Sequence, residues 1–360
     1  PYTQPSSGFL SQPPVYARHA RRMKQGNRGM KLVAWIVGLA ALLWSGVWLA
    51  GAITTERLSR GWFEQRQEAG WVATQDEIET TGFPLAFETA FRGVNLADPF
   101  TEWAWQAEEF HLVQPAWQPQ SLRAIWPRTQ VLATPLEQLT ISSDRMEALL
   151  HVRPTADFAL VQAEADLAAL RIDSDLGWTS AIDSARFEMR DAGEARYDIR
   201  FDATGVSPAG GVLRRLDPRG QLPEVIERVH ASGEVGFDRP WDITALEVSR
   251  PQFTRIDLEE LRADWGALSL RMSGTLEIDG AGVPTGDVAV RAENWRQIIA
   301  LGVNAGLVPP AMQGTLETGL AVIANLSGRA QDVDVTLSFA DGRAYLGPIP
   351  LGPSPYFYLY

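Results

Sequence analysis

The sequence predicts a mainly β (α+β) fold, in which an N-terminal transmembrane helix precedes a long antiparallel sheet, curved or packed on itself, with a few short helices. Two observations predict it. Residues 32–53 are apolar and uncharged, and as a helix they would reach about 33 Å, enough to cross a hydrocarbon core. Farther on, the apolar period changes from helical to two, which is typical of strands with one wet face.

A basic segment precedes the apolar run. It contains no Asp or Glu, and its basic residues are Arg18, Arg21, Arg22, Lys24, Arg28 and Lys31. An excess of Lys and Arg at one end of a span holds that end in the cytoplasm. We therefore expect residues 1–31 to be a cytoplasmic tail and the rest of the chain to lie in the periplasm. A start at Met23 or Met30 would instead make part of this tail upstream translation.

Residues 32–54 are interpreted as a retained anchor in the inner membrane. The alternative is a cleaved signal peptide, since Ala50-Gly51-Ala52 matches the small-residue pattern of a cleavage site. The anchor is favoured because the apolar run is longer than the 7–15 residues typical of a signal core. Residues 55–72 then predict an amphipathic helical stalk, with Leu58, Trp62 and Phe63 at helical spacing and Gly61 and Gly70 as weak points.

Residues 73–360 predict the antiparallel β domain. Apolar and polar residues alternate over 186–190, 196–202, 268–278 and 333–339. Helical patterns are confined to 223–230, 295–303 and 309–324, the last pair being separated at Pro309-Pro310 because Pro is tolerated only at a helix start.

A short internal repeat accompanies the strands. The pattern D-L-x-x-L-R-x-D occurs at 166–173 and at 257–264, and a Trp follows each copy. The domain could therefore consist of two similar halves.

The composition excludes several classes of function. The formal net charge is −12, and all 44 acidic residues follow the apolar run. Such a balance argues against nonspecific nucleic-acid binding, which needs a basic surface. The chain has no Cys, so thiol catalysis, disulfides and thiolate metal sites are excluded.

No motif predicts a reaction. The four His residues are scattered, and no nucleotide-binding loop, nucleophile elbow or paired-His spacing is present. Carboxylate pairs such as Asp173/Asp175 and Asp332/Asp334 have the spacing of a solvated strand face. We therefore assign no catalytic, metal or cofactor-binding residue and expect a protein that is not an enzyme.

The 13 Trp residues are unusual. Trp103 and Trp105 should point the same way along one strand. Core packing is the favoured interpretation, because aromatic side chains bury large areas and suit strands. The alternative is an aromatic groove for a lipid or a sugar.

Several segments together resemble a bacterial envelope family called domain of unknown function 2125 (DUF2125). They are EAGWV (68–72), GFP (82–84), LADP (96–99), WAW (103–105), IWP (125–127), SDRM (143–146) and LGPIPLGP (346–353). None of these motifs implies a known reaction. More loosely, an anchor that carries a long sheet is similar to AsmA-type and LptC-like envelope proteins, and this resemblance implies a curved apolar face that holds or passes lipid chains.

An apolar face as long as this one must be covered. A second sheet, helices or an amphiphilic ligand could cover it, and the expected helices are too short to shield every strand. The expected lipid-facing residues are Leu268, Leu270, Met272, Leu276, Ile278, Val333, Val335, Leu337 and Phe339. The favoured hypothesis is non-enzymatic binding or transfer of an envelope lipid such as a phospholipid. The alternatives are a structural module that recruits other envelope proteins and an enzyme acting on envelope glycans.

Overall fold

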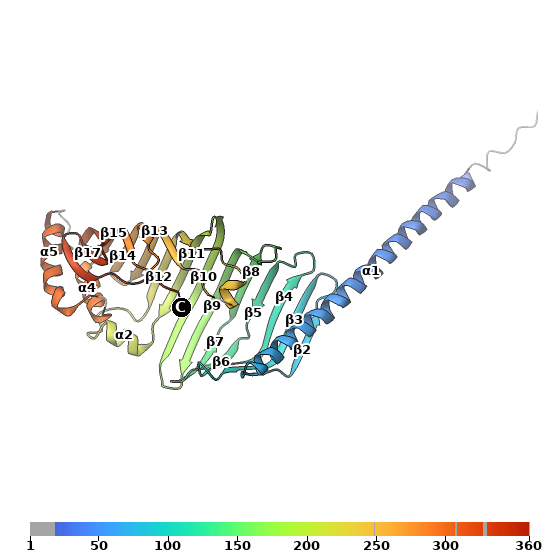
Figure 1. Ribbon diagram of the computed structural model, residues 1–360, viewed down its shortest axis with the longest axis horizontal. Coiled ribbons are helices and arrows are strands. Elements are labelled where there is room, and N and C mark those ends of the chain that lie inside the picture. Colours follow the sequence, from blue (N-terminus) through green and yellow to red (C-terminus); the bar gives the residue numbers. More distant parts are fainter. Residues whose placement is uncertain (1–18, 248, 307, 327–329, 360) are drawn as a thin grey trace, which may run out of the picture.

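A long helix and one continuous sheet make up most of the molecule. The computed structural model describes residues 19–247, 249–306, 308–326 and 330–359. Most of the expected tail, residues 1–18, lies outside this range. Figure 1 shows the helix leaving one end of the sheet, with short helices at the opposite end.

Helix α1 (His19–Glu68) joins the predicted anchor and stalk without interruption. Its 50 residues extend about 75 Å, and Gly61 does not break it. The helix ends just before Gly70, which has a φ of +90° and whose N–H donates to the Gln67 carbonyl at 2.9 Å. Among the described residues, Val33–Glu68 is the one helix long and apolar enough to cross a membrane, judged by length and composition.

The sheet has 18 strands. The first nine are β1 (Val72–Thr74), β2 (Glu77–Thr81), β3 (Ala86–Asp98), β4 (Trp103–Pro115), β5 (Ser121–Ile125), β6 (Thr129–Ala133), β7 (Gln138–Ser142), β8 (Arg145–Val152) and β9 (Leu160–Ser174). The others are β10 (Thr179–Gly193), β11 (Arg196–Ser207), β12 (Ile226–Phe237), β13 (Phe253–Trp265), β14 (Leu268–Ile278), β15 (Pro284–Glu293), β16 (Asp332–Ala340), β17 (Arg343–Leu346) and β18 (Ile349–Pro353).

The strands form an antiparallel meander. From β9 to β18 each strand pairs with the next one along the chain. Nearer the N-terminus, β1 and β2 both pair with β3, β3 pairs with β4, and β4 pairs with both β5 and β6. Strand β5 pairs with β8 and β6 with β7, while β7 and β8 share β9. Many of the connections are short turns, but α2 (Gly210–Leu216) lies between β11 and β12, and residues 294–331, which include three short helices, lie between β15 and β16.

The predicted strands are confirmed where the alternation is clearest. Residues 186–190 and 196–202 lie in β10 and β11, and residues 268–278 and 333–339 lie in β14 and β16. All four pair antiparallel with their neighbours, as one-sided burial requires.

Two of the three predicted helical segments are confirmed. Helix α4 (Trp295–Asn304) is followed by the 3-10 helix η2 (Pro310–Met312) and by α5 (Gln313–Leu326). The helix predicted at 223–230 is wrong, because β12 begins at Ile226. Val229 there pairs with Ala203 on one side and with Ala263 on the other, so two hydrogen-bond ladders outweigh a weak local preference. Helices α2 (Gly210–Leu216) and α3 (Thr244–Glu247) were not predicted.

A line of irregular positions crosses β9 to β11. Ala169, Asp183 and Gly205 are skipped in the register, although pairs form on either side of each. Ala169 and Gly205 have φ values of 51° and 63°, and such positions bend strands. Ala169 lies in the first D-L-x-x-L-R-x-D copy. The second copy changes register at the same place, between Leu258 and Leu261.

Candidate functional site

Three rows of apolar side chains run across the sheet, perpendicular to the strands. Within a row each residue is the register partner of the next, so all members project from one face. The first row is Leu112, Ala124, Ala148, Ala165, Phe187, Phe201, Ala231, Leu261, Met272, Val290 and Val335. The second is Leu122, Leu150, Ala163, Met189, Ile199, Gly233, Leu258, Gly274, Val288 and Leu337. The third is Met146, Leu167, Ala185, Ala203, Val229, Ala263, Leu270, Ala292 and Val333.

The opposite face is charged. Between the first and third rows, an intervening row of register partners consists of Glu147, Asp166, Arg186, Asp202, His230, Arg262, Arg271, Arg291 and Asp334. Ion pairs link several of these side chains to their neighbours, for example Arg186 to Asp166 at 3.8 Å and His230 to Asp202 at 2.7 Å. The sheet is therefore amphipathic over most of its width.

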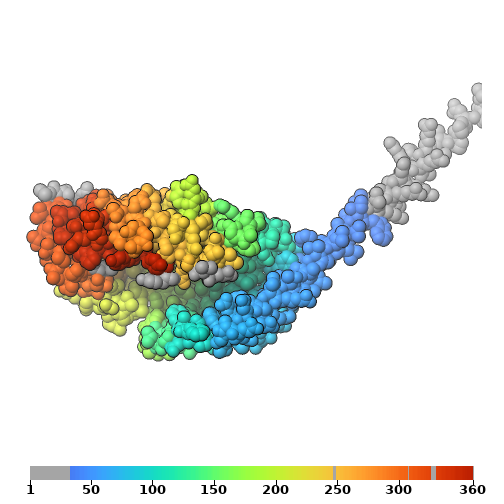
Figure 2. Space-filling view, in the orientation of Figure 1, coloured from blue at the N-terminus to red at the C-terminus, as the bar shows by residue number. Residues whose placement is uncertain are grey.

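Helices cover the apolar face at its two ends. At one end α4 and α5 pack on it, with Leu316 and Leu320 in the same cluster as Val333 and Val335. At the other end Phe63 of α1 packs on β3 and β4. First-row residues between these ends, from Ala148 to Leu261, are only half-buried. Figure 2 shows the molecule hollowed between its yellow-orange and its cyan-to-blue parts, and we call this apolar hollow the trough.

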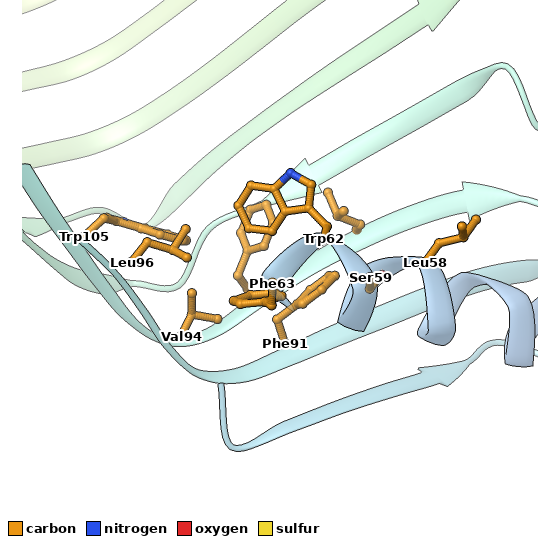
Figure 3. A pocket seen from close by; sticks show the side chains of 10 residues that line it. Leu58, Ser59, Trp62, Phe63, Phe91, Val94, Leu96 and Trp105 are labelled. Atoms are coloured by element: carbon orange, nitrogen blue, oxygen red, sulfur yellow. The ribbon is translucent and has the colours of Figure 1, made fainter. Parts of the chain in front are cut away.

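An apolar pocket of about 420 Å³ lies where α1 meets the sheet. Its walls come from α1, β3 and β4, and Figure 3 shows their side chains around one space. The lining residues are Leu58, Ser59, Trp62, Phe63, Phe91, Val94, Leu96, Trp105, Phe110 and Leu112. Since Leu112 is also the first member of the first row, this stalk pocket opens onto the row that crosses the trough.

Aromatic side chains connect the stalk pocket to the sheet. The ring of Phe91 lies 6.2 Å from that of Phe63 and 6.0 Å from that of Phe110. Phe110 also contacts Trp105 edge-on at 5.7 Å and Trp126 at 5.5 Å. The indole nitrogen of Trp105 donates to Gln130 Oε1 at 2.6 Å. This bond satisfies its polar atom, so Trp105 presents an apolar surface to the pocket.

Hydrogen bonds hold α1 along the edge of the sheet. Glu56 Oε1 accepts from the Thr80 N–H at 3.0 Å, and Arg60 donates to the Ile78 carbonyl at 3.4 Å. Both partners are backbone groups of β2, so side chains of α1 satisfy part of an otherwise open strand edge. The helical wall of the stalk pocket is thereby positioned against the sheet.

A second pocket, also of about 420 Å³, lies near the second row. Leu122, Leu150 and Leu160 line it together with Trp241 and Ile243. The segment that carries Trp241 is fixed by two bonds: the Trp241 N–H donates to the Tyr197 hydroxyl at 2.9 Å, and the Leu160 N–H donates to the Trp241 carbonyl at 2.7 Å. Burial raises the pKa of Tyr197 above its usual value.

The nine residues predicted to face lipid lie on the apolar face, at the end of the sheet that holds α4, α5 and β18. Leu270, Val333 and Val335 pack with α4 and α5. Met272, Leu276, Leu337 and Phe339 form a second cluster that includes Leu351 and Phe357. Leu268 and Ile278 are buried at the two ends of β14. Protein buries six of these nine side chains, whereas Leu270, Met272 and Leu337 are half-buried. Their contact with a lipid stays a prediction.

The pocket residues were not among those predicted to face lipid. Leu58, Trp62 and Phe63 were recognised as one helical face, and Trp105 as a strand residue. Nothing in the local pattern showed that the helix and the strands meet. The signal was the unusual number of Trp residues: Trp105 both packs in the core and lines the stalk pocket, whereas Trp103 is exposed.

Polar clusters lie away from the trough. No group of three or more His, Asp or Glu residues in the described ranges could hold a metal ion. Ser121 Oγ lies 2.6 Å from His151 Nδ1, but the register places this pair on the face opposite Leu122 and Leu150. Asp173 accepts hydrogen bonds from Arg171 and Thr179, which lower its pKa. It is thus one member of a surface ion pair.

Comparison with known proteins identifies the family. The family model described as "Uncharacterized protein conserved in bacteria (DUF2125)" matches residues 48–355, which include the end of the apolar span, the stalk and the sheet. The chain belongs to this family. No curated protein and no solved structure matches it. The DUF2125 match thus covers both the stalk pocket and the trough, and it assigns neither of them a ligand.

Proposed function

We propose that this DUF2125 protein is an inner-membrane-anchored periplasmic protein whose trough binds the acyl chains of an envelope phospholipid, without catalysing a reaction. One observation carries the proposal: the first apolar row stays half-buried between the covering helices, and it begins in the stalk pocket. A half-buried apolar face of this length exceeds what a monomer normally leaves to water.

The size and chemistry of the two pockets support an apolar ligand. Each has a volume of about 420 Å³, within the range of small-molecule sites. Ser59 is the one residue in the stalk pocket with a hydroxyl side chain, so few groups there could hold a lipid headgroup. We therefore place the acyl chains in the trough and the headgroup outside it.

The position of the trough relative to the anchor also supports this function. The helix that could cross the membrane continues directly into the wall of the stalk pocket, because Leu58 and Trp62 belong to the same helix as residues 32–54. A lipid leaving the bilayer would therefore meet apolar side chains within a short distance. The basic residues before the span support the periplasmic orientation.

Photo-crosslinking tests the proposal directly. A benzophenone amino acid replaces Phe201, which projects from the apolar face, and in a matched control it replaces Arg200, which is exposed on the other face. The full chain is irradiated in membranes, and the adducts are identified by mass spectrometry. We expect phospholipid adducts at position 201 and none at position 200. Adducts at position 201 with this chain or another protein, and none with lipid, would instead support the structural-module alternative.

A pair of substitutions tests the stalk pocket. Leu112→Gln places an amide in the first row, whereas Val113→Gln places the same group on the polar face of the same strand, where the side chain is also half-buried. Native mass spectrometry of the gently purified protein should show less bound phospholipid for L112Q and no change for V113Q. Equal lipid content in both variants would contradict a role for this pocket.

A further inference from the structure

Two uncharged loops lie near the apolar span, at one end of the strands. The first connects β2 to β3 and the second connects β4 to β5. Residues 82–87 and 115–122 contain no Asp, Glu, Lys or Arg. The loops adjoin, since the Ala116 N–H donates to the Leu85 carbonyl at 3.0 Å.

The first loop is bound to α1 within the predicted membrane segment. The indole N–H groups of Trp44 and Trp48 donate to the carbonyls of Pro84 and Ala86 at 3.1 and 2.9 Å. Trp48 also stacks on Phe87, with ring centroids 5.5 Å apart. Gly51 permits this approach, because a Cβ atom at Gly51 would lie 2.8 Å from the Phe87 ring.

The loops present large apolar side chains to their surroundings. Phe83, Leu85 and Trp117 are 53%, 61% and 61% exposed. We call these three residues the apolar foot. Opposite strand ends also carry exposed apolar residues, but charged groups adjoin them there: Phe100 lies between Asp98 and Glu102, and Leu136 precedes Glu137.

We propose that the apolar foot inserts into the interfacial layer of the same bilayer that the anchor crosses. The inference rests on the proposed anchoring. Trp44 and Trp48 belong to the span, and their hydrogen bonds hold the first loop, which the second adjoins, at its depth. Exposed aromatic and aliphatic groups in loops that contain no charged residue suit a membrane interface.

Insertion of the foot would define how the trough meets the membrane. Pro119 and Gln120 follow Trp117 in the same loop and line the second pocket, which would therefore open next to the lipid headgroups. Leu58 of the stalk pocket lies ten residues beyond Trp48, about 15 Å farther along α1. The protein would then be attached to the membrane at two places, α1 and the foot. The sheet could therefore not turn relative to the membrane about the axis of α1.

Spin labels measure the depth of each site. The chain has no Cys, so single Cys substitutions can be labelled without background. Leu85→Cys and Trp117→Cys probe the foot, Leu136→Cys and Phe100→Cys are matched exposed controls, and Leu42→Cys probes the span. The full chain is placed in phospholipid nanodiscs, and collisions of the label with oxygen and with a water-soluble nickel chelate are compared.

We expect the ratio of oxygen to nickel collisions at positions 85 and 117 to exceed that at positions 100 and 136 several-fold. Equal ratios at all four positions, with position 42 protected from nickel, would overturn the foot and leave the anchor in place. Nickel access at position 42 would overturn the anchoring itself, and with it the inference.

Discussion

The carboxylate of Asp257 on β13 accepts hydrogen bonds from two nitrogens of Arg255, at 2.5 and 2.9 Å, and from Thr275 Oγ1 at 2.6 Å. These bonds, of which those from Arg255 have the largest effect, lower the pKa of Asp257. A carboxylate whose pKa is lower in the folded state stabilises the fold above its unfolded pKa. That stabilisation is lost as the pH falls through the folded pKa.

We therefore expect Asp257→Asn to lower the unfolding temperature at pH 7. Below about pH 4, the unfolding temperature of the variant should decrease less with falling pH than that of the wild type. Glu259→Gln on the same strand is the control, because Glu259 is exposed. Unfolding temperatures from pH 7 to pH 3 check this. Parallel curves for wild type and D257N would contradict the electrostatic explanation.

Gly274 is required where β14 and β15 approach closely. A Cβ atom at this position would lie 2.2 Å from the carbonyl oxygen of Asp287, and a backbone atom cannot move aside as a side chain can. We expect Gly274→Ala to destabilise the protein by about 1–3 kcal/mol. Gly280→Ala should be nearly neutral, since no atom lies within 4 Å of its Cβ position. Denaturant unfolding of both variants measures the difference.

At the scale of elements, the contact between α1 and the sheet depends on Phe63. Its side chain is buried against Phe91 and Val94, whereas Leu58, five residues earlier on α1, is exposed. Phe63→Ala should lower the free energy of unfolding by about 3–5 kcal/mol, while Leu58→Ala should change it little. Similar losses for both variants, measured in detergent micelles, would show that the helix packs differently.

The elements were predictable to different degrees. The strands at 268–278 and 333–339 were predicted because alternation is a local property of the chain. The segment 223–230 was misjudged as helical, since its strand character depends on β11 and β13. Helix α1 was predicted as an anchor and a stalk, and its course along β2 rests on Glu56 and Arg60, whose partners are backbone groups.

At the scale of the whole molecule, one 18-stranded sheet must cover its apolar face. A second sheet, helices or a ligand could provide this cover. Helices α1, α4 and α5 cover the two ends, and the middle of the first row remains half-buried. The cover thus differs along the sheet, and a ligand is proposed for the stalk pocket and for the part between the helices.

Lipid binding predicts a stability that depends on lipid. A ligand that binds only the folded state adds about 2.7 kcal/mol at 100 times its dissociation constant. Adding phospholipid to delipidated protein should therefore raise the unfolding temperature of the wild type and of V113Q, and raise that of L112Q less. Calorimetry in a constant amount of detergent checks this. An equal rise in all three proteins would indicate a general effect of the lipid on the micelle.

The sequence by itself determined the apolar span, the antiparallel character of the sheet and the family, because these depend on composition and on spacing along the chain. Only the tertiary structure decided which apolar residues are covered and which line the trough. The nine residues predicted to face lipid project from the apolar face, but α4, α5 and the C-terminal strands pack against most of them. Leu58 and Leu112 share a pocket because strand register and the course of α1 bring together residues that lie far apart in the chain. No local pattern in the sequence encodes which distant residues come together in the fold.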